Sequence, residues 1–336
     1  MADTIALVGG DTLLGREIRD LFSESSLGRS LRLVAGDLDE AGKVVAIDDA
    51  LSVLAELNPE ELADAAVVVL AGSAASSRRA LDTHPIGRVI DLTGATEEDP
   101  ESRLRAPLVE DLDLDLDPDS QREDEAAGPV VVAHPAAVAI ALLLRRLHRS
   151  FGVVSSVIQI FEPASERGKP GIEELQQQTV SLFSFQKMPR EVFDSQLSFN
   201  MLAQLGDEAP VSLQQIEERV ERHLATLLNT DDAVPMPSLR LVQAPVFHGY
   251  SVSAWVAFDD APTPREIEEV LSEAGIDVRG SGVEPPNNAG MTGQGGIAVG
   301  SISADRNNAG AVWIWMVADN LRLSAENAAR LAMEVL

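Results

Sequence analysis

The sequence predicts an α/β protein in which a Rossmann-like dinucleotide-binding domain carries an inserted α+β domain. Three observations lead to this prediction: short apolar runs alternate with helix-compatible segments, a glycine-rich turn follows the first run, and a helical segment closes the chain. Runs that are apolar on both faces are typical of a buried parallel sheet. The chain has 336 residues, 45% of them apolar, which is enough for two domains with real cores.

The first domain is expected to open with a strand, a turn and a helix. The strand covers residues 4–8, the turn 9–11, and the helix carries Leu14, Ile18 and Phe22 at helical spacing. Further strands are expected at 31–35, 66–70 and 89–90, with a helix at 76–81. This alternation of strands and helices predicts a doubly wound sheet.

An acidic stretch over residues 110–125, with alternating aspartates, predicts a surface loop and a domain boundary. The spacing of these aspartates is also that of a calcium-binding loop, which needs glycine at its sixth position and glutamate at its twelfth. Counted from Asp111, those positions hold Leu116 and Arg122. We therefore predict no metal site.

The second domain is expected over residues 129–317, and the first over 1–128 plus 318–336. Strands of the second domain are expected at 129–133, 153–161, 239–246 and 251–258, and near Ile297 and Val312. Helices are expected at 138–147, 170–183, 211–228 and 264–274. A last helix over 321–336 is expected to fold back on the first domain, as in proteins whose substrate domain is inserted within a nucleotide-binding one.

Charge and composition exclude several classes of function. The 26 basic and 54 acidic residues give a net charge of −28, which repels nucleic acid and anionic membranes. There is no cysteine, so disulfides, cysteine-ligated metals and a cysteine nucleophile are all excluded. No basic segment follows Met1, and no apolar run approaches the roughly 18 residues of a membrane span. We expect a cytoplasmic protein.

The loop 9–15, Gly-Gly-Asp-Thr-Leu-Leu-Gly, lies where a strand passes into a helix, the context in which such a turn holds a pyrophosphate. Gly9 permits the tight turn and Gly15 permits close helix packing, whereas Thr12 replaces the middle glycine and offers its hydroxyl to a phosphate oxygen. An ordinary turn without a ligand is the alternative.

The turn after the second strand bears on the choice of nucleotide. Asp37 offers an acceptor to the ribose hydroxyls of NAD, while a 2′-phosphate would meet the three carboxylates of Asp37, Asp39 and Glu40. A solvated acidic turn is the alternative interpretation.

Several segments, taken in order, carry a resemblance that covers nearly the whole chain. They are the loop 9–15, Val-Ile-Asp at 89–91, Ala-His-Pro-Ala-Ala at 133–137, Ser-Glu-Arg-Gly-Lys-Pro-Gly-Ile-Glu-Glu-Leu at 165–175, Phe-Asn at 199–200, residues 244–251 and residues 318–322. They resemble aspartate-semialdehyde dehydrogenases, most closely the divergent bacterial paralogues that lack the catalytic residues. The resemblance implies the NADP-dependent enzyme of lysine, threonine and methionine biosynthesis, and a cofactor site that includes Gly10, Leu13 and Asn320. It also implies a homodimer in which the inserted α+β domain is the substrate and dimerisation domain.

The family reaction is reductive dephosphorylation of aspartyl phosphate by NADPH through a cysteine thioester. By the resemblance, Ala137 stands at the nucleophile position and Tyr250 at the position of the general base. Three positions that hold substrate-binding cations in the family are occupied here by Gln243, Glu97 and Glu217. A fourth position, a glutamine in the family, is occupied by Glu162. These changes disfavour a phosphorylated dicarboxylate.

We therefore expect a homodimer that has lost catalysis, keeps a weakened NAD or NADP cleft, and senses a small-molecule ligand or binds a partner. The degenerate pocket comprises His134, Ala137, Glu162, Gln243, His248 and Tyr250. One alternative is an NAD(P)-dependent oxidoreductase on a different substrate that uses His134 or Tyr250 for acid–base chemistry. If residues 247–251 are extended, His248 and Tyr250 share one strand face. The other alternative is a structural partner of an active paralogue.

Overall fold

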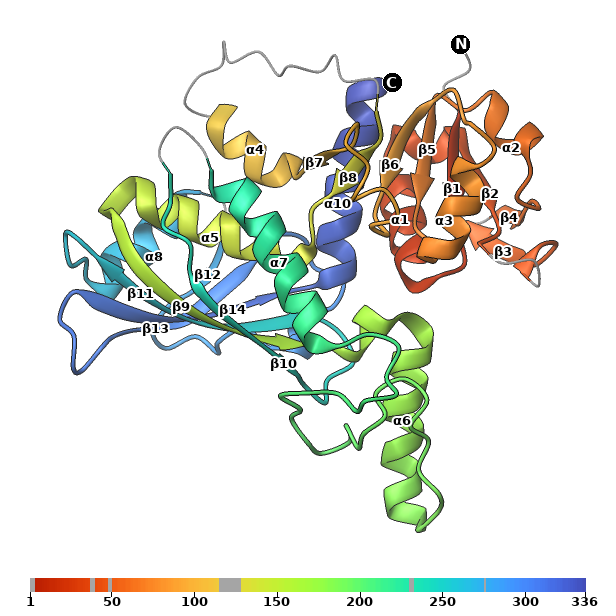
Figure 1. Ribbon diagram of the computed structural model, residues 1–336. Helices are drawn as coiled ribbons and strands as arrows, with labels where there is room; N and C mark the ends of the chain where they lie inside the picture. Colours follow the sequence, from red (N-terminus) through yellow and green to blue (C-terminus); the bar gives the residue numbers. More distant parts are fainter. Residues whose placement is uncertain (1–3, 37–39, 48–49, 115–127, 230–232, 275) are drawn as a thin grey trace. The chain divides into compact units, whose positions relative to one another are not determined.

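A computed structural model describes residues 4–36, 40–47, 50–114, 128–229, 233–274 and 276–336 (Figure 1). The chain divides into two compact units, unit 1 with Met1–Ala133 and Ser324–Leu336, and unit 2 with His134–Leu323. The predicted fold class is confirmed: one unit is a Rossmann-like α/β domain and the other has a mixed sheet with helices. Over the described ranges, no helix has both the length and the apolar character that a membrane crossing needs.

Unit 1 is built on a six-stranded parallel sheet in the order β2-β1-β5-β6-β8-β7. Its strands are β1 (Ile5–Val8), β2 (Leu31–Val34), β5 (Val67–Leu70), β6 (Arg88–Asp91), β7 (Arg103–Arg105) and β8 (Val130–Val132). Its helices are α1 (Leu13–Ser23), α2 (Pro59–Ala63), α3 (Ala74–Leu81), α4 (Pro107–Leu114) and the greater part of α10 (Asn320–Val335). A hairpin of β3 (Val44–Ile47) and β4 (Ala50–Val53) is an element that the sequence did not predict.

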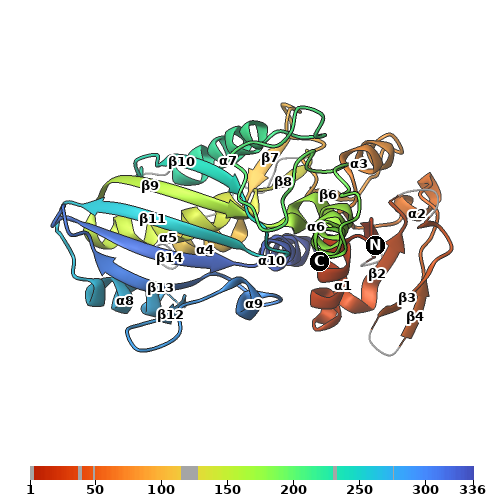
Figure 2. The same ribbon diagram turned by 90° about the horizontal axis from the view of Figure 1, so that it is seen from below.

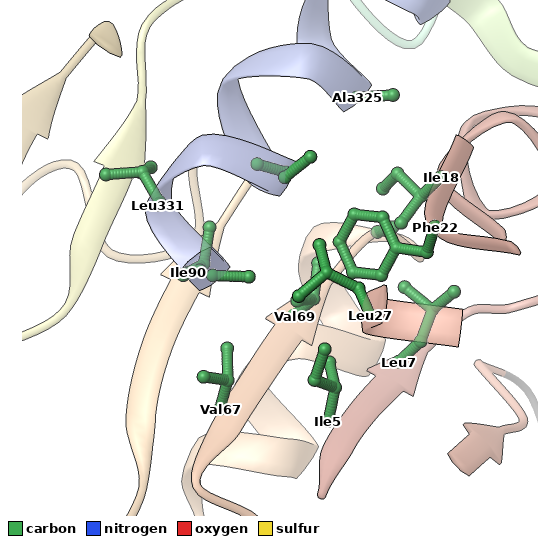
Figure 3. Packing of buried hydrophobic residues seen from close by; sticks show 14 of the residues in the cluster. Ile5, Leu7, Ile18, Phe22, Leu27, Val67, Val69, Ile90, Ala325 and Leu331 are labelled. Atoms are coloured by element: carbon green, nitrogen blue, oxygen red, sulfur yellow. The ribbon is translucent and has the colours of Figure 1, made fainter. Parts of the chain in front are cut away.

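The core of unit 1 explains why its strands are apolar throughout. Successive side chains of a strand point to opposite faces, and both faces of this sheet are covered. Ile5 and Leu7 pack in a cluster with side chains of α1 and α10 (Figure 3). Ala6 and Val8 pack on the other face, against Leu62 of α2. The closing helix thus packs on the first domain, as the sequence predicted.

Unit 2 holds a six-stranded mixed sheet in the order β10-β9-β11-β14-β13-β12. Its strands are β9 (Val153–Glu162), β10 (Ser238–Gln243), β11 (Tyr250–Phe258), β12 (Asp277–Arg279), β13 (Ala298–Ala304) and β14 (Ala311–Ala318). Its helices are α5 (Pro135–Phe151), α6 (Gly168–Ser184), α7 (Leu213–Leu228), α8 (Pro264–Glu273) and α9 (Asn288–Met291). Helices α5, α7 and α8 cover one face of the sheet. On the other face Met291 of the short helix α9 packs with Ala298 and Val317 at the β13–β14 end, and Figure 2 shows no other helix of the described residues lying over the middle of β9 and β11.

The structure differs from the sequence prediction in three places. The strand expected at 129–133 was assigned to the second domain, but β8 pairs with β6 and β7, so unit 1 continues to Ala133. Residues 247–251 are not extended: β11 begins only at Tyr250, because Gly249 has a φ of +79° and turns the chain. The expectation that His248 and Tyr250 share a strand face is therefore wrong. Of the acidic stretch, Asp111 lies in α4 and residues 115–127 lie outside the described residues.

Candidate functional site

The glycine-rich loop of unit 1 has the backbone shape of a nucleotide-binding turn. Gly9 adopts a φ of +86°, and a Cβ on it would lie 2.5 Å from the Cα of Gly72. A Cβ on Gly15 would overlap the carbonyl oxygen of Gly9, so this first turn of α1 can pack here only without a side chain. Both glycines are thus required by close approach of backbone.

The sequence suggested that the Thr12 hydroxyl is offered to a phosphate oxygen, but in the structure it is turned inward to the backbone. Its Oγ1 accepts from the N–H of Gly15 at 2.9 Å, which makes Thr12 the N-cap of α1. The same atom lies 2.8 Å from the carbonyl oxygen of Ala71 and 2.9 Å from that of Gly9, either of which takes its single proton. The hydroxyl therefore holds the turn together.

The charges around this loop are mixed. The Asp11 carboxylate accepts from Arg16 at 2.7 Å and lies 4.0 Å from the ammonium group of Lys43. After β2, Glu40 accepts from the N–H of Gly36 at 3.3 Å, and Arg79 donates to the carbonyl of Gly36 at 2.6 Å. Asp37 lies outside the described residues. The loop thus carries one carboxylate, Asp11, which is paired with the two cations Arg16 and Lys43.

The expected substrate-site residues of unit 2 gather where three neighbouring strands begin or end. Glu162 ends β9, Gln243 ends β10 directly opposite it, and Tyr250 begins β11. His134 is the N-cap of α5, and Ala137 lies in the first turn of that helix. All five residues are buried, with at most 4% of the surface of any of them exposed. We call these five residues the central cluster.

Two charged residues that the sequence did not single out complete this site. Arg167 donates to Glu162 at 2.7 Å, and Glu166 accepts from the side-chain amide of Asn320 at 2.9 Å. Glu166 also lies 4.0 Å from Nε2 of His134. Their position in the sequence could have indicated them, because the charged pair Glu166-Arg167 lies between Ser165 and a glycine, shortly after a buried strand. The two arise from the turn that links β9 to α6.

Burial governs the protonation of this site. It raises the pKa of Glu162 to about 7, an effect that the charge of Arg167 opposes and that of Glu166 reinforces. It also raises the pKa of Glu166. Burial, together with the positive charge of Arg219, lowers the pKa of His134 well below its usual range. At neutral pH His134 is therefore uncharged.

Tyr250 is held in its protonated form. Burial and the charges of Glu166 and Glu162 raise its pKa well above its usual range. Hydrogen bonding of the phenol to the Glu166 carboxylate adds to this rise in the pKa of Tyr250. A phenol in this state is not a general base at neutral pH.

The remaining side chains of the site make structural contacts. Nδ1 of His134 accepts from the N–H of Ala136 at 3.3 Å, and the backbone N–H of His134 donates to Nδ1 of His223 at 2.9 Å. Gln243 donates to the carbonyl oxygen of Glu162 at 2.8 Å. His248 lies in the turn before β11, and its ring Nδ1 finds no partner in the described part of the chain.

Two other expected positions have different surroundings. Glu217 of α7, where the resemblance places a lysine, accepts from the backbone N–H of Leu241 in β10 at 2.6 Å. Asn320 belongs to unit 2, where Oδ1 lies 3.0 Å from the hydroxyl of Ser165 and 3.2 Å from the N–H of Gly249. Within the described ranges, no group of three or more histidine, aspartate or glutamate side chains is arranged to hold a metal ion.

Comparison with known proteins gives consistent matches along the whole chain. Residues 144–323 match the family model "Semialdehyde dehydrogenase, dimerisation domain". The chain is 24% identical to an aspartate-semialdehyde dehydrogenase of Rickettsia bellii, over 99% of this chain and 97% of that protein. It is 25% identical to a USG-1 protein homolog of Pseudomonas aeruginosa, with the same coverage of 99% and 97%. A solved structure of a probable aspartate-semialdehyde dehydrogenase from Pseudomonas aeruginosa superposes with a TM-score of 0.83, at 25% identity, covering 99% of this chain and 98% of the other.

Proposed function

The chain belongs to the semialdehyde dehydrogenase family, and on that premise we propose that it is a member which has lost catalysis and acts by binding a ligand or partner. One observation carries the proposal: the nucleophile position holds Ala137, whose side chain is completely buried. The family reaction needs a thiolate that attacks an acyl carbon, and a methyl group forms no thioester.

The charges of the central cluster also support the proposal. A phosphorylated dicarboxylate needs cations that are free to hold its anionic groups. Arg167 is already paired with Glu162, and Gln243 is engaged with the carbonyl oxygen of the same residue. A second carboxylate, Glu166, lies close by. An anionic substrate would therefore meet like charge in a buried site, which is costly.

The proposal is tested by assaying phosphate-dependent reduction of NADP with aspartate semialdehyde as substrate. A catalytically active aspartate-semialdehyde dehydrogenase, assayed in parallel, is the positive control. We expect no turnover above the background without protein. Turnover that survives purification and disappears in the Tyr250→Phe variant would overturn the proposal.

An acid–base role on a different substrate has one observation in its favour, the pKa of about 7 that burial gives Glu162. A group that titrates near neutrality is suited to proton transfer. Its carboxyl is completely buried and its Oε2 is paired with Arg167, so a substrate reaches it only if the surrounding side chains move apart. NAD(P)-dependent turnover of any carbonyl or alcohol substrate that is lost in Glu162→Gln would favour this second function.

We further propose that unit 1 keeps a weakened NAD or NADP site, the cofactor that supplies hydride in active members. Gly9, Gly10, Leu13 and Gly15 would cradle the pyrophosphate through the backbone at the start of α1. Asp11 and the inward-turned Thr12 are the reasons to expect weak binding. Thermal unfolding in the presence of NAD, NADP or neither measures it, because a ligand that binds only the folded chain raises the melting temperature.

We expect a homodimer, and we propose the face of the unit 2 sheet opposite α5, α7 and α8 as its interface. Trp255 and Trp313 are directly opposite each other on β11 and β14, and Trp315 lies two residues further along the same face. Val157 of β9, 42% exposed, pairs with Trp255. Aromatic side chains of this kind are enriched at the centres of protein interfaces. We call this surface the tryptophan face.

Sedimentation velocity over a dilution series tests this assembly. Trp313→Ser, at a side chain that is 41% exposed, is expected to weaken self-association, whereas Ile86→Ser, at a side chain of unit 1 that is 89% exposed, is expected to leave it unchanged. A chain that sediments as a monomer at every concentration would contradict the homodimer.

A further inference from the structure

We propose that unit 1 carries a second ligand site, a cavity between the last turns of α10 and the strands β6 and β8, which binds a small α-amino acid with an aliphatic side chain. The cavity has a volume of about 230 Å³, and all of its lining residues belong to unit 1. We call it the α10 cavity. It lies outside the central cluster, so the inference goes beyond the function proposed above and holds whether or not catalysis is lost.

The apolar wall of the α10 cavity belongs to the core of unit 1. Ile90 of β6, Val130 of β8 and Leu331 of α10 line it. They are members of one hydrophobic cluster, and each is at most 3% exposed. Figure 3 shows Ile90 and Leu331 near each other within this cluster. The walls of an unfilled cavity lose the contacts that packed atoms would make, and a bound aliphatic side chain would restore them.

The volume of the cavity limits the size of its ligand. An apolar cavity of about 150 Å³ binds benzene. A cavity of about 230 Å³ therefore suits a molecule with about half as many non-hydrogen atoms again, which is the size of leucine or isoleucine. Sites for drug-sized molecules are larger, roughly 300–1,000 Å³. A nucleotide or a peptide is thus too large for this cavity.

The charged groups that line the cavity have both signs. Arg105, 7% exposed, donates through Nη1 to Glu334 at 3.1 Å and through Nε to Glu110 at 2.9 Å. One buried guanidinium thus lies between two carboxylates. Arg88, at the start of β6, also lines the cavity and brings the formal charge of these four groups to zero.

This arrangement suits a zwitterion better than an ion of a single sign. The ammonium group of the ligand would donate to Glu334, whose side chain is 21% exposed. Its carboxylate would accept from Arg88, whose guanidinium has five N–H donors, more than a single carboxylate partner takes up. A simple carboxylic acid would be repelled by the net charge of −28. A simple amine would leave an unbalanced positive charge in a partly buried site, which is costly.

The α10 cavity is distinct from the glycine-rich loop of the nucleotide site. The loop follows β1, and β5 lies between β1 and the strands β6 and β8 that border the cavity. No residue of the loop 9–15 lines the cavity. An amino acid and a nucleotide would therefore contact different side chains, and their binding can be measured separately.

Isothermal titration calorimetry with L-leucine tests the proposal, and we expect a dissociation constant of about 1 mM or lower. Two further probes each lack one charged group: isocaproate has no ammonium group, and isopentylamine has no carboxylate. Each should bind about tenfold or more weakly than L-leucine. The absence of any heat of binding with L-leucine up to about 10 mM would overturn the proposal. Equal affinity for L-leucine and either truncated probe would overturn the zwitterion site as well.

Two variants locate the ligand within the α10 cavity. Glu334→Gln should weaken the binding of L-leucine by about tenfold or more without weakening that of isocaproate, which has no ammonium group. Arg88→Met should weaken L-leucine and isocaproate and spare isopentylamine. Glu56→Gln, at an exposed glutamate of unit 1 that does not line the cavity, is the matched control and should change nothing.

Thermal unfolding without ligand shows whether each variant is folded, and either folded variant is enough to decide. Binding of L-leucine that both variants leave unchanged would overturn the assignment to this cavity. These measurements use neither nucleotide nor aldehyde, so a negative result leaves the proposed loss of catalysis standing.

Discussion

Substitution of Glu162 by glutamine should change how stability depends on pH. The carboxyl is completely buried, and its pKa rises from the ordinary 4.5 to about 7 in the folded chain. Below pH 4.5 both the folded and the unfolded chains bind the proton, and this group adds no penalty. Between pH 4.5 and about 7 only the folded chain keeps this proton, so the free energy of unfolding falls as the pH rises through this window. At 1.36 kcal/mol per pH unit, the loss amounts to about 3 kcal/mol by pH 8.5.

Glutamine resembles the protonated carboxyl and does not ionise. Glu162→Gln should therefore exceed the free energy of unfolding of the parent chain by only about 1 kcal/mol near pH 5 and by about 3 kcal/mol at pH 8.5. Urea denaturation followed by tryptophan fluorescence, at half-unit steps from pH 5 to 9, measures the difference between the two chains. All three tryptophans lie in unit 2, together with Glu162.

Glu266→Gln is a matched control for this experiment. Glu266 accepts from the backbone of Thr263 at the start of α8, and this hydrogen bond lowers its pKa. It is ionised in both states above pH 5, so its replacement should shift stability by a constant amount over the range tested. A difference between Glu162→Gln and the parent that does not vary from pH 5 to 9 would refute the assignment of a neutral titration to Glu162.

We expect three further outcomes, for substitutions in the central cluster, in the glycine-rich loop and in helix α6. Ala137→Cys alone should give no aspartate-semialdehyde turnover, and its thiol should react with Ellman's reagent only after unfolding, because residue 137 is completely buried. Thr12→Gly should tighten NADP or NAD binding, seen as a larger ligand-induced rise in melting temperature. Loss of the N-cap of α1 costs about 1 kcal/mol or less, so the helix should remain folded. An unchanged or smaller rise would contradict the proposal that Thr12 weakens the nucleotide site. Gln178 of α6 accepts from the N–H of Leu197 and donates to the carbonyls of Pro189 and Ser195. Gln178→Leu should leave these buried backbone groups unpaired and destabilise residues 185–200 by about 3 kcal/mol, so limited proteolysis should cut that segment faster; an unchanged cleavage rate would contradict this role of Gln178.

The pattern of apolar residues predicted those strands and helices in which the buried side chains follow the period of the element. The strand-turn-helix unit at the N-terminus was readable because Ile5 and Leu7, and then Ile18 and Phe22, follow the two periods that a buried strand and an amphipathic helix require. The β3-β4 hairpin was missed because Val44 and Val53 lie opposite each other on its exposed side, so the usual alternation of buried apolar and exposed polar residues is absent.

The site was predicted only in part. The resemblance placed Ala137, Glu162 and Tyr250 in one pocket, and the structure brings them together where β9, β11 and α5 begin or end. It gave no sign that Arg167 folds back on Glu162, or that the turn at Gly249 removes His248 from the strand. Hydropathy reports which side chains are apolar and carries no information on a positive φ.

The sequence by itself determined that this chain has no thiol, the observation on which the proposed loss of thioester chemistry rests. It also predicted the strands and helices that follow a clear hydrophobic period, because that periodicity acts over a few residues. Only the tertiary structure decided the state of the groups that remain. Glu162 and Gln243 lie 81 residues apart in the chain and meet because β9 and β10 pair in register. The pKa of Glu162 depends on how much water that packing excludes, a property that belongs to the folded chain and to no segment of it.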